Sequence, residues 1–374
     1  MPFLPFTRPT IDEDTIQGVA EVLRSGWVAS GPKVQEFEAA LSTYLGGRTV
    51  RAMTSATEAL EIALRVCGVG PGDEVITPAM SFVATANVIC RVGARPVFVD
   101  IDIETRNIDL DKAAAAITPR TKALMPVHFA GLPVDIDRLY ELAGRRHLRV
   151  VEDAAHAIGS AWRGRRIGSF GDFVVLSFHP NKNITTIEGG AIVGANGDEL
   201  RAIERHRFHG LTKDAAGGAE VHFPGGKSNL SDVAARVGLG QLPHLDAWNA
   251  RRRTLVARYF EKLRPEPAMF LPQQSDEGHS WHIFTPLLPL DRLTATRPVF
   301  IREMHERGIG VGVHYPAIHL FEHYRSLGYG DGDFPNAERV GRETVTLPLF
   351  PAMTADDVDR VCTAVTAVLT AHRR

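Results

Sequence analysis

The chain has 374 residues, of which 44% are hydrophobic and 23% charged, and its formal net charge is −2. This composition is typical of a globular protein with room for one large domain and a smaller one. The small net charge offers no basic field for nucleic acid or an anionic membrane, and no apolar stretch approaches the ~20 residues of a membrane span.

The N-terminus lacks the charged and apolar regions of a signal peptide, and the three cysteines are isolated within apolar segments. Both features favour a reducing cytoplasm and argue against a disulfide scaffold. His206 and His209 are spaced for one helical face but have no third ligand, so we expect no metal site. We expect a cytoplasmic protein that binds neither nucleic acid nor membrane.

After a first helical pattern at Asp12–Leu23, short β-rich runs alternate with helical patterns such as Thr57–Val66 and Ile136–Arg146. The expected strands are Val50–Thr54, Glu74–Thr77, Pro96–Ile101, Ala123–Phe129, Leu148–Glu152, Phe173–Phe178 and Ala191–Gly194. This alternation predicts an α/β fold with a mostly parallel, seven-stranded sheet covered on both faces. In such sheets functional groups gather at the carboxyl ends of the strands.

The pattern changes near residue 245, so we expect a large domain over residues 1–245 and a smaller α+β domain over residues 246–374. The elements expected in the second domain are a helix at Ala250–Lys262, a strand at Trp281–Leu290, a helix at Arg297–Glu306, a strand at Gly308–Tyr315 and a helix at Ala355–Thr370. The basic run 251–253 reads as a solvated face of the first of these helices.

Lys182 lies in a polar turn between two apolar segments, in the stretch LSFHPNKNITTIEGGAIV. An uncharged lysine amine attacks carbonyls, and an enclosed site lowers the ordinary lysine pKa of about 10.4. A lysine at the end of a buried strand is therefore suited to form a Schiff base. For a lysine considered alone, an ordinary surface loop is the simpler interpretation.

Asp153 ends another expected strand, in VVEDAAHAIGS, and lies 29 residues before Lys182. Pyridoxal phosphate requires such a carboxylate to keep its ring nitrogen protonated. His156, three residues later, could bond the phenolic oxygen of the same cofactor. The structural alternatives are a helix N-cap for Asp153 and a half-buried, hydrogen-bonded histidine for His156.

Two further segments add to this pattern. Ser55, Ala56 and Thr57 stand where an expected strand enters a helix, and N–H groups at a helix N-terminus bind phosphate. Phe82 follows a strand end, where a flat ring could stack on a planar cofactor. An ordinary helix cap and ordinary core packing remain the alternatives.

Taken together, these segments resemble the DegT/DnrJ/EryC1/StrS sugar aminotransferases, which have the type I fold of pyridoxal-phosphate enzymes. The resemblance covers essentially the whole chain through these motifs: SGWVASGPKVQEFE, GDEVITPAMSFVATAN, GARPVFVDID, VEDAAHAIGS, SFHPNKNITTIEGGAIV, HRFHGL and GIGVGVHYPAIHL. FLPFTRP, ITPRTKALMPVHFAG and TLPLFPAMT resemble the branch that aminates UDP-4-keto-L-arabinose for lipid A modification, a step of lipopolysaccharide synthesis.

The resemblance implies a role for each matching position. Lys182 would be the Schiff-base lysine and Asp153 the partner of the ring nitrogen. The residues that would bind other parts of the cofactor are Ser55, Ala56, Thr57, Phe82, His156 and Ser177. The residues that would lie near the substrate are Trp27, His179, His314, Tyr315 and His319, with His179 close to the reacting atoms.

One motif departs from the family pattern. Many members have Gly-x-Asn-x-Arg, which enters the neighbouring subunit's phosphate site, whereas this chain has Lys227 and Asn229 at the Asn and Arg positions. A lysine still neutralises phosphate as a point charge. The resemblance therefore implies a homodimer with shared active sites, and it leaves open which of the two residues reaches the phosphate.

The expected reaction is transamination of a nucleotide-linked keto sugar, a UDP-4-keto-pentose in the first instance, with L-glutamate as donor. The alternatives are a UDP-2-acetamido-4-keto-hexose or a dTDP-linked 3- or 4-keto-hexose as acceptor. A pyridoxal-phosphate sugar dehydratase is a further alternative, although known ones replace the lysine with histidine. A non-catalytic protein on this fold would not need Lys182 or Asp153.

Overall fold

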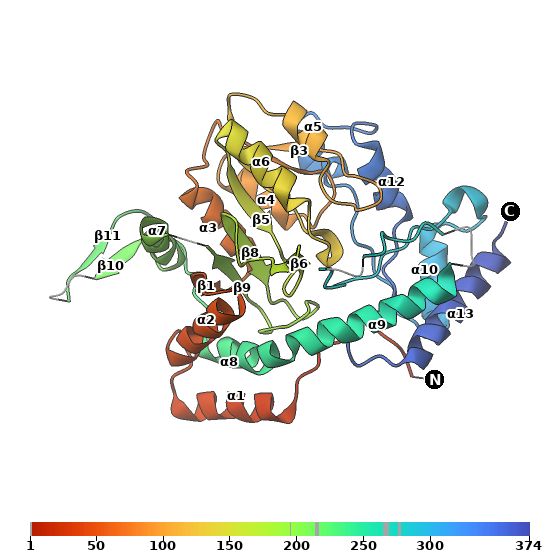
Figure 1. Cartoon of the computed structure of the whole chain (residues 1–374), viewed down its shortest axis with the longest axis horizontal. Helices are drawn as coiled ribbons and strands as arrows, with labels where there is room; N and C mark the ends of the chain where they lie inside the picture. The colour runs from red at the N-terminus through yellow and green to blue at the C-terminus, as the bar shows by residue number, and fades with distance from the viewer. Residues whose placement is uncertain (1, 195, 214–216, 265–268, 276–277) are drawn as a thin grey trace.

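The computed structural model describes residues 2–194, 196–213, 217–264, 269–275 and 278–374, and its centre is a seven-stranded sheet (Figure 1). The strands, in their order across the sheet, are β1 (Val50–Met53), β9 (Gly190–Val193), β8 (Phe173–Ser177), β5 (Arg149–Asp153), β4 (Thr121–Leu124), β2 (Glu74–Pro78) and β3 (Arg95–Val99). β9 runs antiparallel to both of its neighbours, and the other pairings are parallel. The predicted mostly parallel, seven-stranded sheet is confirmed.

Helices cover both faces of the sheet. Successive residues of a strand point to opposite faces, so the apolar residues of these strands are buried only if helices pack on each face. One apolar cluster contains Val174 and Leu176 of β8 and packs them against helix residues such as Phe37 and Leu139. The cluster on the other face contains Val175 of β8. The helices are α1 (Glu13–Ser25), α2 (Pro32–Tyr44), α3 (Ala56–Val66), α4 (Ala84–Arg91), α5 (Leu110–Ala115), α6 (Ile136–Arg146), α7 (Gly197–Arg207), α8 (Asp232–Gln241), α9 (Leu245–Leu263), α10 (Arg297–Glu306), α11 (Glu322–Arg325), α12 (Pro335–Glu343) and α13 (Ala355–Ala371).

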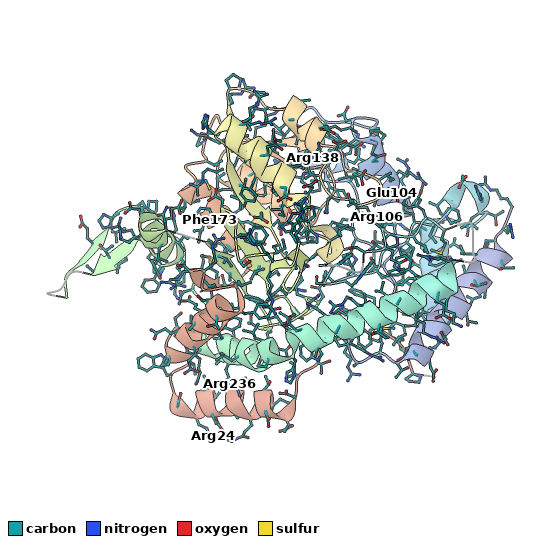
Figure 2. The ribbon with its side chains drawn as sticks, viewed as in Figure 1. Arg24, Glu104, Arg106, Arg138, Phe173 and Arg236 are labelled. Carbon is teal, nitrogen blue, oxygen red and sulfur yellow. The ribbon has the colours of Figure 1, made fainter. Side chains whose placement is uncertain are left out.

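Two structures lie at the edges of this body. A hairpin of β10 (Leu211–Lys213) and β11 (Ala219–Val221) projects from it beside α7, and α1 lies along α8 (Figure 1). Figure 2 shows Arg236 of α8 between these two helices, where it donates to the main-chain oxygen of Asp14. A second small hairpin pairs β6 (Ala161–Trp162) with β7 (Arg165–Arg166). None of the helices in the described ranges has the length and apolar composition needed to cross a membrane.

The two strands predicted after residue 245 are wrong as continuous elements. Residues 281–290 and 308–315 are joined to other segments only through isolated bridges, such as Phe284 with Leu347 and Gly312 with Thr346. Pro286 and Pro289 remove N–H donors from the first segment, and glycines weaken the second. The apolar residues of both segments pack into buried clusters and not into a sheet: Trp281, Phe284, Leu288 and Ile309 into a second core, and Ile283 and Leu287 into a separate cluster.

The second core lies around α9, α10 and α13, on the side of the molecule where both termini are found (Figure 1). α9 is the long helix that runs from α8 to this core. Leu245 at its start packs in the core beneath the sheet, whereas Leu255 and later apolar residues pack in the second core. Leu4 also packs there. We propose that the division into a large and a small domain falls near residue 245, on the basis of this change of core along one helix.

The predicted solvated face at 251–253 is wrong for its central residue. Arg252 is 2% exposed, and its Nη1 donates to the main-chain oxygens of Trp281, His282 and Leu349 at 3.4, 3.1 and 2.9 Å. Burial lowers the pKa of its guanidinium to about 10, so it stays charged at neutral pH. Arg252 thereby connects α9 to two segments that lack regular structure, whereas Arg253 is exposed.

We predict that Arg252→Met lowers the free energy of unfolding by about 2–4 kcal/mol, because three buried carbonyl groups lose a charged donor. Arg253→Met is the matched control, and its effect should stay within about 0.5 kcal/mol. Urea denaturation followed by circular dichroism measures both. Equal effects of the two substitutions would contradict the assigned role of Arg252.

Candidate active site

The turn that carries Lys182 joins the carboxyl end of β8 to β9. Pro180 cannot donate a main-chain hydrogen bond, and the turn closes where the N–H of Lys182 donates to the oxygen of His179 at 2.9 Å. The N–H of Thr186 then donates to the oxygen of Phe178 at 3.0 Å, which directs the chain back into β9. The lysine therefore stands at the carboxyl end of a buried strand, as predicted.

The buried side chain of Asn183 fixes this turn from behind. Its Nδ2 donates to Asn249 Oδ1 of α9 at 2.7 Å and to the oxygen of Ser280 at 3.2 Å. Its Oδ1 lies 3.0 Å from Nδ1 of His282. The position of Lys182 thus depends on contacts with residues about 65 and 100 positions further along the chain.

Asp153 ends β5, beside β8, and its carboxylate is buried. Oδ2 accepts from the hydroxyl of Thr85 at 2.7 Å, and Oδ1 accepts from the N–H of Ala155 at 3.2 Å. Burial raises the pKa of Asp153, while these donors and the nearby Lys182 act in the opposite direction. No salt bridge to Asp153 is found in the described ranges, so a cationic ligand group would find here a carboxylate without a bonded cation.

The ends of β8 and β5 open into a cavity of about 360 Å³. It brings together most of the residues predicted from the sequence: Ser55, Ala56, Thr57, Phe82, Asp153, His156, Ser177, His179, Lys182, His314 and Tyr315. These residues come from the ends of four strands or the segments that follow them, and from a segment of the second half of the chain. The cavity is therefore a product of the sheet order and of the packing of the C-terminal part against it.

One wall of the cavity is the N-terminus of α3. Ser55 is the N-cap, and its Oγ accepts from the N–H of Glu58 at 3.1 Å. The first N–H groups of a helix have no partner inside the helix, so Ala56 and Thr57 can present theirs to an anion. A Cβ at Gly190 would lie 2.3 Å from the nitrogen of Ala56, so only glycine lets β9 approach this wall.

Burial lowers the pKa of Lys182 to about 8, and the charge of Asp153 opposes this shift. About a tenth of the amine is then uncharged at pH 7, far more than for a free lysine. His314, which is buried, has its pKa lowered to about 4 by burial and then by Lys182. Its Nδ1 lies 2.7 Å from the hydroxyl of Thr346. His314 is therefore neutral at pH 7.

An aromatic wall faces these groups. The ring of Phe82 lies 5.8 Å from that of Tyr315, and 55% of Phe82 is exposed. An exposed ring at the mouth of a cavity is available for stacking, whereas the alternative of core packing is excluded by this exposure. His179 also lines the cavity, with Nδ1 2.8 Å from Asn181 Oδ1.

Four predicted site residues do not line the cavity. His319 is fully buried, and its Nε2 lies 3.2 Å from Glu338 Oε1. A side chain without exposed surface cannot contact a substrate, and this corrects the assignment of His319 as a substrate residue. Trp27 is 60% exposed after α1. Lys227 contacts Asn229 and lies over the ring of Phe208, and Asn229 bonds to Ser30. In their own chain, Trp27 and Lys227 are exposed and Asn229 is half-buried, and none of the three lines the cavity.

Three residues that the sequence analysis did not single out contribute to the site. Thr85 orients Asp153, and Asn183 fixes the turn that carries Lys182. Glu188 lines the cavity, with its Oε1 3.9 Å from Nε2 of His179. Glu188 and Asn183 lie within the quoted stretch around Lys182, so their spacing was an available signal. Thr85 lies within the motif GDEVITPAMSFVATAN, but its contact with Asp153 spans 68 positions and cannot be read from that motif. In the described ranges, no group of three or more His, Cys, Asp or Glu side chains could bind a metal ion.

Comparison with known families gives the class of protein. The sequence model of the DegT/DnrJ/EryC1/StrS aminotransferase family matches residues 9–366. The chain therefore belongs to this family, whose enzymes depend on pyridoxal phosphate.

Solved structures of several relatives superpose over nearly the full length. Spr1654 of Streptococcus pneumoniae, named as a sugar aminotransferase and solved in its PMP form, is 34% identical with a TM-score of 0.93, and the match covers 98% of this chain and 99% of that one. S. venezuelae DesV, solved with a ketimine intermediate, is 34% identical with a TM-score of 0.90 and coverage of 98% of both chains. Helicobacter pylori PseC, an aminotransferase of pseudoaminic acid biosynthesis, is 28% identical with a TM-score of 0.93 and coverage of 99% and 100%.

The donor set of the cavity fits pyridoxal phosphate. A buried carboxylate without a bonded cation suits a protonated ring nitrogen, and a helix N-terminus with Ser177 nearby suits a phosphate. An amine with a pKa lowered to about 8 suits an aldehyde. The three groups are chemically distinct and converge on one cavity.

We predict that labelling of Lys182 in the apoprotein by an amine-selective reagent reaches half of its maximal rate near pH 8. Only the uncharged amine reacts, and below pH 8 its fraction falls about tenfold per pH unit. Mass spectrometry of the peptide measures the rate. In Asp153→Asn the midpoint should fall further, because the charge that opposes the shift is gone. A midpoint near 10.4 would contradict the assigned environment.

Proposed function

We propose that this protein transfers an amino group from L-glutamate to the keto carbon of a nucleotide-linked sugar, with a UDP-4-keto-pentose as the expected acceptor. The observation that carries the proposal is the convergence of Lys182, Asp153 and the N-terminus of α3 on one cavity. Relatives named as sugar aminotransferases support the sugar acceptor. Glutamate as donor, the UDP-4-keto-pentose and a role in lipopolysaccharide synthesis rest on the sequence resemblance.

Pyridoxal phosphate, when bound, accepts the electron pair released as a proton leaves the donor carbon. Lys182 would hold the cofactor until the donor displaces it, and its amine would then move the proton as general acid and base. A pKa of about 8 suits this role, because the amine can both accept and release a proton near neutral pH. Asp153 would keep the ring nitrogen protonated by its charge.

The remaining assignments complete the pocket. Ser55, Ala56, Thr57 and Ser177 would bind the phosphate, and Phe82 would stack on the ring. The residues assigned to the side of the cavity that receives the substrate are His179, His314 and Tyr315. Trp27 does not line the cavity of its own chain, and its assignment to the substrate rests on the sequence resemblance alone.

The test is incubation of the protein with L-glutamate and a panel of nucleotide keto sugars, with mass spectrometry of the products. The panel contains UDP-4-keto-pentose, UDP-2-acetamido-4-keto-hexose and dTDP-linked 3- and 4-keto-hexoses. We expect an amino sugar and 2-oxoglutarate from the first acceptor, and neither product from Lys182→Ala. Amination of only another acceptor would change the substrate assignment, whereas amination of no acceptor with any donor would refute the proposal.

We also propose that the protein is a homodimer with shared active sites. Lys227 and Asn229 do not reach the cavity of their own chain, and Lys227 contacts the 40% exposed ring of Phe208. Val221 on the nearby hairpin is 61% exposed. A cation that does not reach the cavity of its own chain, beside exposed apolar side chains, suits an interface that supplies a phosphate contact to the partner.

Complementation between two inactive variants tests the shared site. Lys182→Ala should be inactive, and Lys227→Ala/Asn229→Ala should bind cofactor poorly. In a mixed dimer, one site combines an intact Lys182 with an intact partner loop, so activity should approach one working site per dimer. If verified heterodimers are no more active than the sum of the two parents, the loop serves its own subunit.

A further inference from the structure

His156 and Tyr315 form a hydrogen-bonded pair in the wall of the cavity. Nδ1 of His156 accepts from the main-chain N–H of Ala130 at 3.2 Å, and Nε2 lies 3.2 Å from the hydroxyl oxygen of Tyr315. The two rings are stacked, with centroids 6.0 Å apart and planes inclined by 24°. Both side chains line the cavity.

The main chain fixes the tautomer of His156. A main-chain N–H can only donate, so Nδ1 carries a lone pair and no proton. Burial, followed by the positive charge of Lys182 and by His314, lowers the pKa of His156 well below its ordinary value. The imidazole is therefore neutral, and its one proton is on Nε2.

This tautomer determines the direction of the Tyr315 hydroxyl. Nε2–H of His156 donates to the oxygen of Tyr315, so the phenolic proton must point away from His156. The titratable groups around Tyr315 are Asp153, Lys182, His156 and His314. Burial, and then the charge of Asp153, raises the pKa of Tyr315, so the phenol remains neutral and is a donor at physiological pH.

The sheet order places this pair opposite the phosphate-binding wall. That wall follows β1, Lys182 follows β8, and His156 follows β5, which lies beyond β8 in the sheet. In pyridoxal phosphate, the ring carbon that bears the aldehyde lies between the ring carbons that carry the phosphate arm and the phenolic oxygen. A ring with its phosphate at α3 and its nitrogen at Asp153 therefore directs its phenolic oxygen toward His156 and Tyr315.

We propose that Tyr315 donates its phenolic proton to the phenolic oxygen of bound pyridoxal phosphate, and that His156 is a positioning residue that orients Tyr315. The proposal rests on the proposed function. It differs from the direct contact between His156 and this oxygen that the sequence resemblance implied, because both nitrogens of His156 already have partners in the protein.

A measurable consequence follows for the colour of the holoenzyme. A donor to the phenolic oxygen stabilises its negative form, so it lowers the pH at which the bound chromophore loses its proton. Loss of the donor should raise that pH. This readout reports on the hydrogen bond itself and requires no turnover.

The experiment is a pH titration of the visible absorbance of the holoenzyme. Tyr315→Phe should raise the midpoint by about one pH unit or more, which is about tenfold in the proton dissociation constant. Tyr324→Phe is the matched control, because its buried hydroxyl donates to Asn87 Oδ1 and lies outside the cavity lining. Its midpoint should equal that of the wild type, and thermal melting should verify that both variants fold.

A second variant separates positioning from direct contact. In His156→Asn, the side-chain oxygen can still accept from the N–H of Ala130, but no group reaches Tyr315. Its midpoint should rise by no more than that of Tyr315→Phe, and the double variant should equal Tyr315→Phe alone, since the two residues act through one hydrogen bond.

Additive shifts would mean that His156 contacts the phenolic oxygen itself and would overturn the proposal. An unchanged midpoint in Tyr315→Phe would also overturn it while leaving the proposed function intact. A wild-type protein without a visible band after reconstitution with pyridoxal phosphate would refute both, and so the two failures are distinguishable.

Discussion

The burial of Lys182 opposite Asp153 is the constraint on which the site depends. Burial disfavours the charged form of each group, and their mutual attraction offsets only part of that cost, as the lowered pKa of the lysine and the raised pKa of the aspartate indicate. A cavity that contains such a pair is less stable empty than with a ligand that supplies complementary charges. The ring nitrogen of pyridoxal phosphate can be protonated and then pairs with the charge of Asp153. Its aldehyde reacts with the uncharged amine of Lys182, so this cofactor suits both groups.

Contacts with distant parts of the chain hold Lys182 in this buried position. Asn183 next to Lys182 donates to Asn249 and to the oxygen of Ser280, which are acceptors in this arrangement, so its own oxygen must accept from His282 Nδ1. The contacts join the lysine turn to α9 and to the segment around residue 280. Arg252, one turn of α9 further along, donates to the oxygens of Trp281 and His282. One helix therefore fixes both the turn that carries Lys182 and the irregular segment that packs behind it.

Main-chain groups orient two polar side chains that follow the carboxyl ends of β5 and β8. The Ala130 N–H sets the tautomer of His156, and the Ser280 carbonyl sets the orientation of the Asn183 amide. A main-chain N–H can only donate and a main-chain carbonyl can only accept. Each of these groups therefore fixes which atom of the contacting side chain accepts or donates, and that side chain in turn fixes the direction of its next hydrogen bond. A site built in this way has its hydrogen-bond directions determined before any ligand binds, which is the preorganisation that catalysis by electrostatic stabilisation requires.

The sequence alone determined the mostly parallel sheet, the position of Lys182 and Asp153 at strand ends, and the helix start at Ser55–Thr57. These features are local: each depends on apolar alternation, on a strand end or on a helix start, and neighbouring residues encode them. Only the tertiary structure decided that 281–290 and 308–315 are not strands, that Arg252 is buried and Arg253 is not, and that His319 packs against Glu338 instead of lining the cavity. The burial of Arg252 and His319, the contact of Thr85 with Asp153, and the pairing of His156 with Tyr315 depend on which distant segments meet. Which segments meet is decided by their packing in the folded chain, and periodicity along the sequence does not encode it.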